Sequence, residues 1–214
     1  MRVVFSLTMV AMLCAGCTGG SGKNASEGPD PSSDLVKEQQ DTENKELAED
    51  LEPLQIQAPE SGKLGSPKDA VQNAQSAVES VVNVAQQIAV RGDGQSKGID
   101  QVADGFVKGQ LEALAAERWQ MGVHQVGEAK VVSVDTKNVD LDAKVPSMDL
   151  LVCLDLSGID VVDENGNSFE GLLYKPKEPV LNTYGAIFTD GQWKISTHNI
   201  PEDSTCGDAA TKDD

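Results

Sequence analysis

The chain has 214 residues, of which 35 are acidic and 17 are basic, so its formal net charge is −18. A surface this acidic argues against nucleic-acid binding, which needs patches of Lys and Arg, and against electrostatic adhesion to anionic lipid. Aromatic residues make up only 4% of the chain, which is low for a carbohydrate-binding surface.

The N-terminus has the layout of a secretory signal peptide. Arg2 precedes an apolar run at 3–13, which is shorter than the roughly 20 residues of a membrane span. The following Ala15-Gly16-Cys17 resembles the lipobox of bacterial lipoproteins, although Cys14 stands where that motif usually has Leu. The resemblance implies that residues 1–16 are removed, that Cys17 carries the lipid (palmitate), and that the protein is anchored at the extracytoplasmic face of the cell membrane.

Residues 17–65 are polar, and large apolar side chains are sparse among them. Such a segment buries too little surface to offset the entropy lost on ordering. We therefore expect a flexible acidic tether over 17–65, a folded domain over 66–206 and a polar tail over 207–214.

Two helices are expected at the start of the domain. Ser66-Pro67-Lys68-Asp69 combines a serine cap with proline at the first helical position, and an apolar stripe then continues to about residue 90. The Arg-Gly-Asp tripeptide at 91–93 fits an interhelical turn better than an integrin ligand. A second stripe predicts a helix over 99–118 that ends next to Trp119.

After residue 121 the apolar period changes to alternation, which indicates strands. The segments concerned are 126–134, 150–156, 159–162, 169–174, 180–188 and 193–197. Asn165-Gly166 is typical of a tight hairpin turn. Two helices followed by antiparallel strands predict an α+β domain, with the helices packed on one face of a curved sheet.

Two cysteines remain in the predicted domain, Cys153 and Cys206. An even pair in an oxidising compartment favours a disulfide between them. A pair of free thiols is the alternative.

The order of these elements resembles the nuclear transport factor two-like superfamily, in the versions borne by actinobacterial secreted proteins and lipoproteins. The matching motifs are Leu151-Val152-Cys153-Leu154-Asp155, Val162-Asp163-Glu164-Asn165-Gly166 and Gly191-Gln192-Trp193-Lys194-Ile195. The resemblance implies a cone-shaped domain. Its members range from isomerases and cyclases to binding domains, so the fold alone leaves the function open.

Candidate chemical residues are few. His124 and His198 have no acidic partner in the sequence and are expected to be structural, with His198 facing away from Trp193. Asp155 is expected at a strand end or on the solvated face, and an interior general base is the alternative. The turn at 163–166 overlaps a calcium-loop pattern but lacks its first and twelfth ligands, so no metal site is predicted there. No cofactor and no catalytic residue are predicted either.

The larger aromatic side chains are expected in the core by their helical and strand spacing. They are Phe106, Trp119, Tyr184, Phe188 and Trp193. Lining of a ligand pocket is the alternative.

The sequence thus predicts a non-catalytic binding or interaction domain in the cell envelope. Its expected partners are the membrane, through the lipid anchor, and a cell-wall component, a small ligand or another envelope protein. Two alternatives stay open: an accessory domain of an envelope assembly, and an isomerase or cyclase with an interior carboxylate.

Overall fold

A computed structural model of the chain describes residues 51–58, 61–169, 178–202 and 205–206. These residues belong to one compact unit, Glu43–Asp214. The predicted signal peptide, Cys17 and the polar tail lie outside the described residues.

Helix α2 spans Pro67–Arg91, as predicted. The Ser66 hydroxyl accepts from the Asp69 N–H, and the Asp69 carboxylate accepts from the Ser66 N–H, which completes a capping box. Hydrogen bonds from Ser66 lower the pKa of Asp69. Gly92 ends the helix in the left-handed conformation, with φ 61°.

The second predicted helix is divided, which corrects the expectation of one helix over 99–118. A 3₁₀ turn, η1, covers Ile99–Gln101, and helix α3 covers Gly105–Met121 with Asp104 as its cap. Between them the chain runs beside the last strand, where Ile195 exchanges main-chain hydrogen bonds of 3.0 and 2.9 Å with Val102 and Asp104. Pairing with a strand distant in sequence thus interrupts a stripe that reads as continuous.

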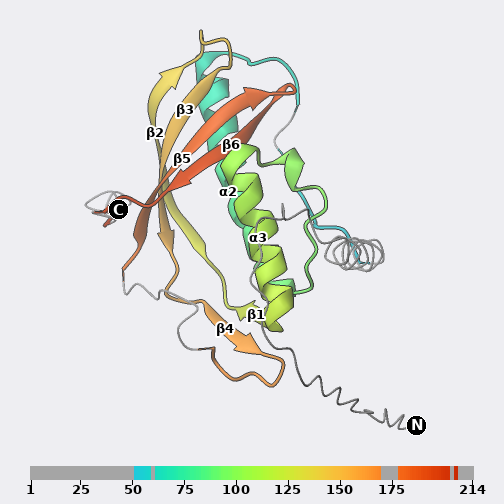
Figure 1. The fold of residues 1–214 in the computed structure, drawn as a ribbon. Helices are drawn as coiled ribbons and strands as arrows, with labels where there is room; N and C mark the ends of the chain where they lie inside the picture. Colours follow the sequence, from blue (N-terminus) through green and yellow to red (C-terminus); the bar gives the residue numbers. More distant parts are fainter. Residues whose placement is uncertain (1–50, 59–60, 170–177, 203–204, 207–214) are drawn as a thin grey trace, which may run out of the picture. The chain divides into compact units, whose positions relative to one another are not determined.

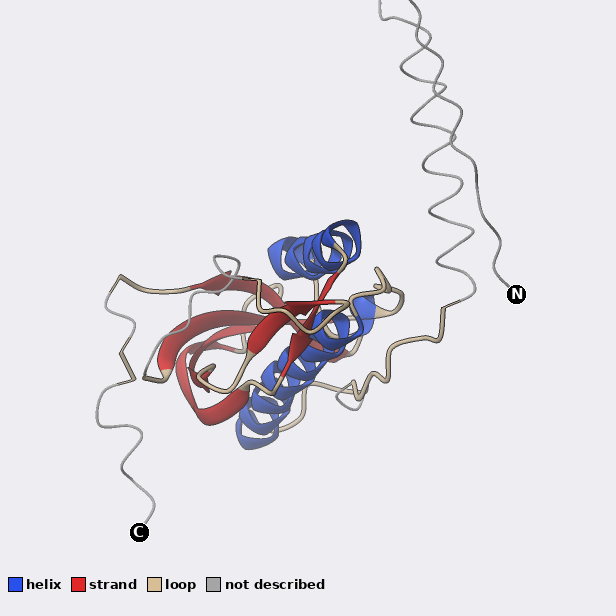
Figure 2. Cartoon of the chain, turned by 90° about the horizontal axis from the view of Figure 1, so that it is seen from below, coloured by secondary structure: helices blue, strands red, loops and turns tan. Residues whose placement is uncertain are grey.

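Four antiparallel strands form the main sheet in the order β2-β3-β5-β6. Their bounds are Lys130–Asp140 for β2, Ser147–Asp155 for β3, Val180–Thr189 for β5 and Gln192–Asn199 for β6. Both helices lie beside the curved strands (Figures 1 and 2), and α3 also packs against α2 and β6. The α+β class with helices packed on antiparallel strands is confirmed.

A separate two-stranded ribbon pairs β1, Val123–Val126, with β4, Asp160–Asp163. The sequence predicts one strand over 126–134, but Gly127 turns the chain at φ 78° and separates β1 from β2. A side chain at Gly127 would collide with the carbonyl of Gly158. The expected return strand at 169–174 lies mostly outside the described residues, and Ser168 makes a single bridge to Val162.

The core lies between the helices and the inner face of the main sheet. Its members are apolar side chains from both helices and from three strands, including Ala74, Val78, Val81, Ile88, Leu111, Leu150, Val152, Ala186, Trp193 and Ile195. Burial of this surface is the main force that holds the two layers together.

Residues 51–58, which we call the strap, extend along α2. Leu54 is buried in the core, and Ile56 and Ala58 pack against it. The hydrogen bonds of the strap join its main chain to side chains of α2 and of the loop after it. The predicted tether includes these residues, whereas the structure docks them, so the docked part of the chain begins ahead of the expected domain boundary at Ser66.

Candidate ligand cleft

Side chains fill the space between the helices and the sheet. Trp193 is 1% exposed, Tyr184 is also buried, and the rings of Phe188 and Trp193 meet edge to face at 5.6 Å. Trp193 and Tyr184 are core members, as predicted, and Phe188 is partly buried and packs against the core. Burial raises the pKa of Tyr184 to about 12.

Phe106 and Trp119 are not core residues, contrary to prediction. They are 61% and 44% exposed. Because α3 begins at Gly105, its inward stripe is set by Val107, Leu111 and Ala115, and Phe106 falls outside that stripe.

His198 faces the core side of the sheet, which corrects the expectation that it faces away from Trp193. Gly185 pairs with Thr197 but Ala186 pairs with Ile195, so Ser196 is an extra residue that forms a bulge. The bulge shifts the alternation by one residue. The His198 ring stacks on Tyr184 at 4.5 Å, and His198 Nε2 lies 2.9 Å from Asn182 Oδ1. Burial lowers the pKa of His198.

Asp155 lies at the end of β3 and accepts a hydrogen bond of 2.9 Å from the Ser157 N–H. The hydrogen bonds from Ser157 lower the pKa of Asp155, and Lys130 across the strand pair adds a smaller effect in the same direction. An interior general base would have a raised pKa, so Asp155 does not have the environment of such a base.

Asp163 serves the turn that follows β4. Its carboxylate accepts hydrogen bonds from the N–H groups of Asn165 and Asn167 and from the Asn167 side chain. The bonds from Asn167 are the main cause of its lowered pKa. Both oxygens are thus engaged within the turn. Across the described ranges, no three His, Cys, Asp or Glu side chains gather in a way that could hold a metal ion.

Cys153 and Cys206 form the predicted disulfide, with their Cα atoms 5.7 Å apart. Cys153 lies on the outer face of β3, opposite the helix-packed face, and Thr205 bridges to Val180 of β5. The cross-link therefore fixes residues 205–206 against the sheet.

A cleft of about 630 Å³ opens between α2 and β1. This volume lies within the range of small-ligand sites. The wall from α2 consists of Asn83, Gln86, Gln87, Val90 and Arg91, and the opposite wall consists of His124, Gln125, Val126, Gly127 and Glu128.

Two close contacts fix the separation of the cleft walls. Gly92, just after α2, lies so near Val123 that an added Cβ would sit 2.6 Å from the Val123 carbonyl oxygen. Further along, Gln86 Oε1 accepts a hydrogen bond of 3.0 Å from the Ala129 N–H. The width of the cleft is thus set by the packing of α2 against β1 and the residues that follow it.

The chemistry of the cleft is apolar and amide-rich. Val90 and Val126 are 43% and 41% exposed, one on each wall. Four carboxamides also line the cleft, from Asn83, Gln86, Gln87 and Gln125, and the two charged side chains of the lining, Arg91 and Glu128, are of opposite sign. Such a lining suits an uncharged ligand that combines an apolar face with hydrogen-bonding groups.

The sequence did not indicate this cleft. Its two walls are about 40 residues apart in the chain, and valine and glutamine are common on helices and strands. Of the predicted site residues it contains only His124. The one local signal is Val90, a valine near the end of α2 that falls outside the inward stripe.

Comparisons with known proteins identify no family. No protein-family model matches the chain, and no curated protein sequence matches it. Among solved structures the chain is similar to the intermembrane space region of the chloroplast protein ARC6, with 17% identity over 59% of this chain and 95% of that one and a TM-score of 0.34. A phospholipid-binding protein from Ralstonia solanacearum shares 17% identity over 60% of this chain and 78% of its own, with a TM-score of 0.25.

At these TM-scores neither likeness says anything about function. The resemblance to nuclear transport factor two-like domains stays a prediction. In the part of the chain that the structure describes, no helix is long and apolar enough to cross a membrane.

Proposed function

We propose that the protein is a non-catalytic binding domain, held at the extracytoplasmic face of the cell membrane by a lipid on Cys17, and that its ligand binds in the cleft between α2 and β1. The observation that carries the binding proposal is the pair of exposed valines, Val90 and Val126, on facing walls of a cleft rimmed by carboxamides.

The packing of the domain supports a site outside the helix–sheet interior. Trp193 and Tyr184 occupy the inner face of the sheet, so a ligand there would have to displace core side chains. The cleft needs no such displacement. The signal-like N-terminus and the docked strap fit a domain that is attached through its N-terminal side.

A fragment screen tests the binding proposal. The full chain carrying Cys17→Ser would be labelled with ¹⁵N and exposed to a library of neutral small-molecule fragments, and amide shifts would be recorded by NMR. We expect hits to shift the signals of residues 124–128 and the side-chain amide of Gln86. Val90→Asp and Val126→Asp should each weaken those hits about tenfold or more, because they place a charge on the apolar surface.

Val139→Asp is the matched control, because Val139 is 46% exposed and lies outside the cleft. The cleft would be refuted as the ligand site if fragment affinity is unchanged by all three substitutions, or if the shifted signals lie elsewhere on the domain. The anchor is tested separately. The unsubstituted protein should partition with membranes and Cys17→Ser should not.

A further inference from the structure

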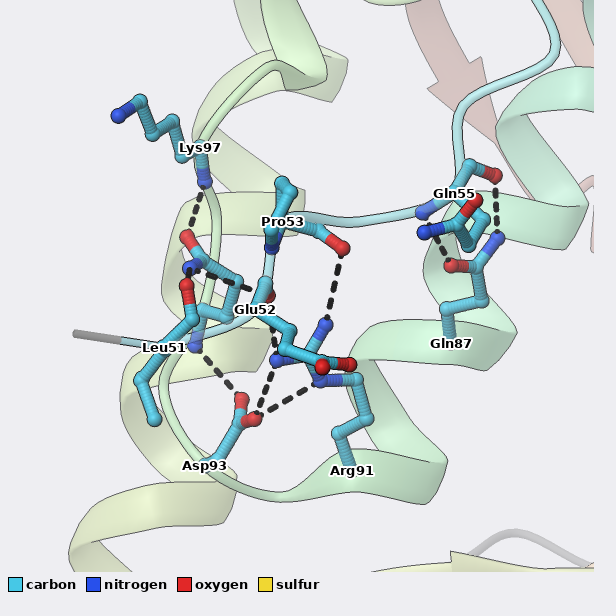
Figure 3. A network of polar contacts seen from close by, with 9 residues as sticks. Leu51, Glu52, Pro53, Gln55, Gln87, Arg91, Asp93 and Lys97 are labelled. Atoms are coloured by element: carbon cyan, nitrogen blue, oxygen red, sulfur yellow. Dashed lines mark hydrogen bonds and ion pairs between the residues drawn. The ribbon is translucent and has the colours of Figure 1, made fainter. Parts of the chain in front are cut away.

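One row of side chains on α2 belongs both to the cleft and to the binding site of the strap. Asn83, Gln87 and Arg91 follow each other at four-residue steps, so they lie on one face of the helix. All three line the cleft. Figure 3 shows Gln87 and Arg91 in contact with the strap.

The Gln87 side chain makes a pair of hydrogen bonds to the strap main chain, as a neighbouring strand does in a sheet. Its Nε2 donates to the Gln55 carbonyl, and its Oε1 accepts from the Gln55 N–H, both at 2.8 Å. Asn83 Oδ1 accepts a third bond from Gln87 Nε2 at 2.6 Å. The amide is therefore held in one orientation by the strap on one side and by Asn83 on the other.

Arg91 and Gln95 hold the beginning of the strap. Arg91 donates to the carbonyls of Glu52, at 2.6 Å, and Pro53, at 3.4 Å, and pairs with Asp93 at 2.8 Å. The buried Gln95 donates to the Leu51 carbonyl at 3.2 Å. Every strap atom in these bonds belongs to the main chain, so the contact depends on the extended path of the strap (Figure 3).

A docked strap consequently orders part of the cleft wall before any ligand arrives. If the strap leaves, Gln87 and Arg91 keep only their contacts with Asn83 and Asp93. They then regain part of their rotamer freedom, and a ligand must order them itself. Loss of such preorganisation for two long side chains weakens binding by roughly tenfold.

We propose that strap docking and ligand binding in the cleft favour each other. The inference rests on the proposed binding function of the cleft and adds its regulation. Coupling between two sites is reciprocal, so a ligand that binds more tightly to the strap-docked form must hold the strap more firmly in place. The chain just ahead of the domain thereby responds to occupancy of the cleft.

A covalent probe tests the coupling without a known ligand. The full chain would carry Cys14→Ser, Cys17→Ser and Val126→Cys, and N-ethylmaleimide would be attached to the new thiol so that the adduct occupies the cleft. Hydrogen exchange of residues 51–58 would be followed before and after labelling. We expect exchange in the strap to slow at least fivefold, with the Gln55 N–H among the groups affected.

Val139→Cys with the same label is the control and should leave strap exchange unchanged. Unchanged strap exchange in the labelled Val126→Cys protein would overturn the coupling, and faster exchange would overturn its sign. A second measurement uses Leu54→Ala, which loosens the strap at its buried residue without touching the cleft lining.

Fragments that bind the cleft should bind the Leu54→Ala protein roughly tenfold more weakly. Equal affinity would refute the coupling and leave the binding function standing. Absence of cleft-binding fragments from the unsubstituted chain would instead refute the proposed function, so the two failures are distinguishable.

Discussion

Ser196 decides which way His198 faces. As the extra residue in a bulge, it moves His198 from the outer face of the sheet to the helix-packed face. There the imidazole stacks on Tyr184 and contacts Asn182, and Asn182 is itself held by a bond of 2.9 Å to the Val180 carbonyl. A titratable group is thereby placed in a partly buried setting that favours its neutral form.

His198 should make the domain less stable in mild acid. Because burial lowers its pKa below the ordinary 6.5, the unfolded chain takes up the proton first as the pH falls. Stability is fully present above pH 6.5 and declines from there down to the folded-state pKa. Urea denaturation at about pH 7.5 and 5.5 measures the decline.

His198→Phe keeps a ring against Tyr184 but cannot be protonated, so its stability should depend less on pH over that interval. The comparison uses the change in the free energy of unfolding with pH in each protein. The absolute stabilities are not compared, since the substitution also removes the contact with Asn182. Equal slopes would show that protonation of His198 does not set the decline.

At the scale of elements, the features that could be predicted from the sequence are those with a local signal. The cap residues of α2 are consecutive in the chain, and the alternation of β3 and β5 is visible within ten residues. The unpredicted features depend on distant partners. The break before α3 needs Ile195, and the turn at Gly127 needs Gly158.

The strap shows the same limit. Its hydrogen bonds use main-chain atoms and so leave no pattern in its side chains. The apolar signal is limited to the short alternation of Leu54, Ile56 and Ala58, of which Leu54 alone is fully buried. The cleft was equally hidden, because it arises where α2 passes β1. Local sequence patterns predict helices and strands. The strap site and the cleft depend on how those elements pack together, which local patterns do not encode.

The contact of α2 with β1 gives a prediction at this scale. Gly92→Ala should destabilise the domain by about 3 kcal/mol, since the left-handed conformation costs roughly 1–2 kcal/mol for a residue with a side chain and the new methyl group meets the Val123 carbonyl. Urea denaturation measures the loss.

Gly122→Ala is a closely matched control. Gly122 also ends a helix, at φ 62°, but an added Cβ there meets no atom within 4 Å. It should therefore lose about 1–2 kcal/mol. If the two substitutions cost the same, the close approach of Gly92 to Val123 adds no penalty to the left-handed conformation.

At the scale of the whole molecule, the disulfide closes a long covalent loop. Cys153 and Cys206 are 53 residues apart, and the loop between them includes β4, β5 and β6. Cross-linking restricts the unfolded chain more than the folded one, and a loop of this length corresponds to about 4 kcal/mol in the chain-entropy model.

The double substitution Cys153→Ser with Cys206→Ser should therefore lower the free energy of unfolding by about 4 kcal/mol. Denaturation of the oxidised and reduced forms of the unsubstituted protein gives the parallel measurement. If reduction leaves the denaturation midpoint in place, the cross-link does not stabilise the domain.

The path of the strap also has a mechanical consequence. The chain enters at Leu51, beside Gln95 and Arg91, and runs back along α2 before the helix begins after Ser66. A pull on the chain ahead of Leu51 therefore meets the bonds to Gln95, Arg91 and Gln87 in turn before it reaches the first turn of α2. These bonds and the buried Leu54 are therefore expected to be lost before the first turn of α2 is loaded.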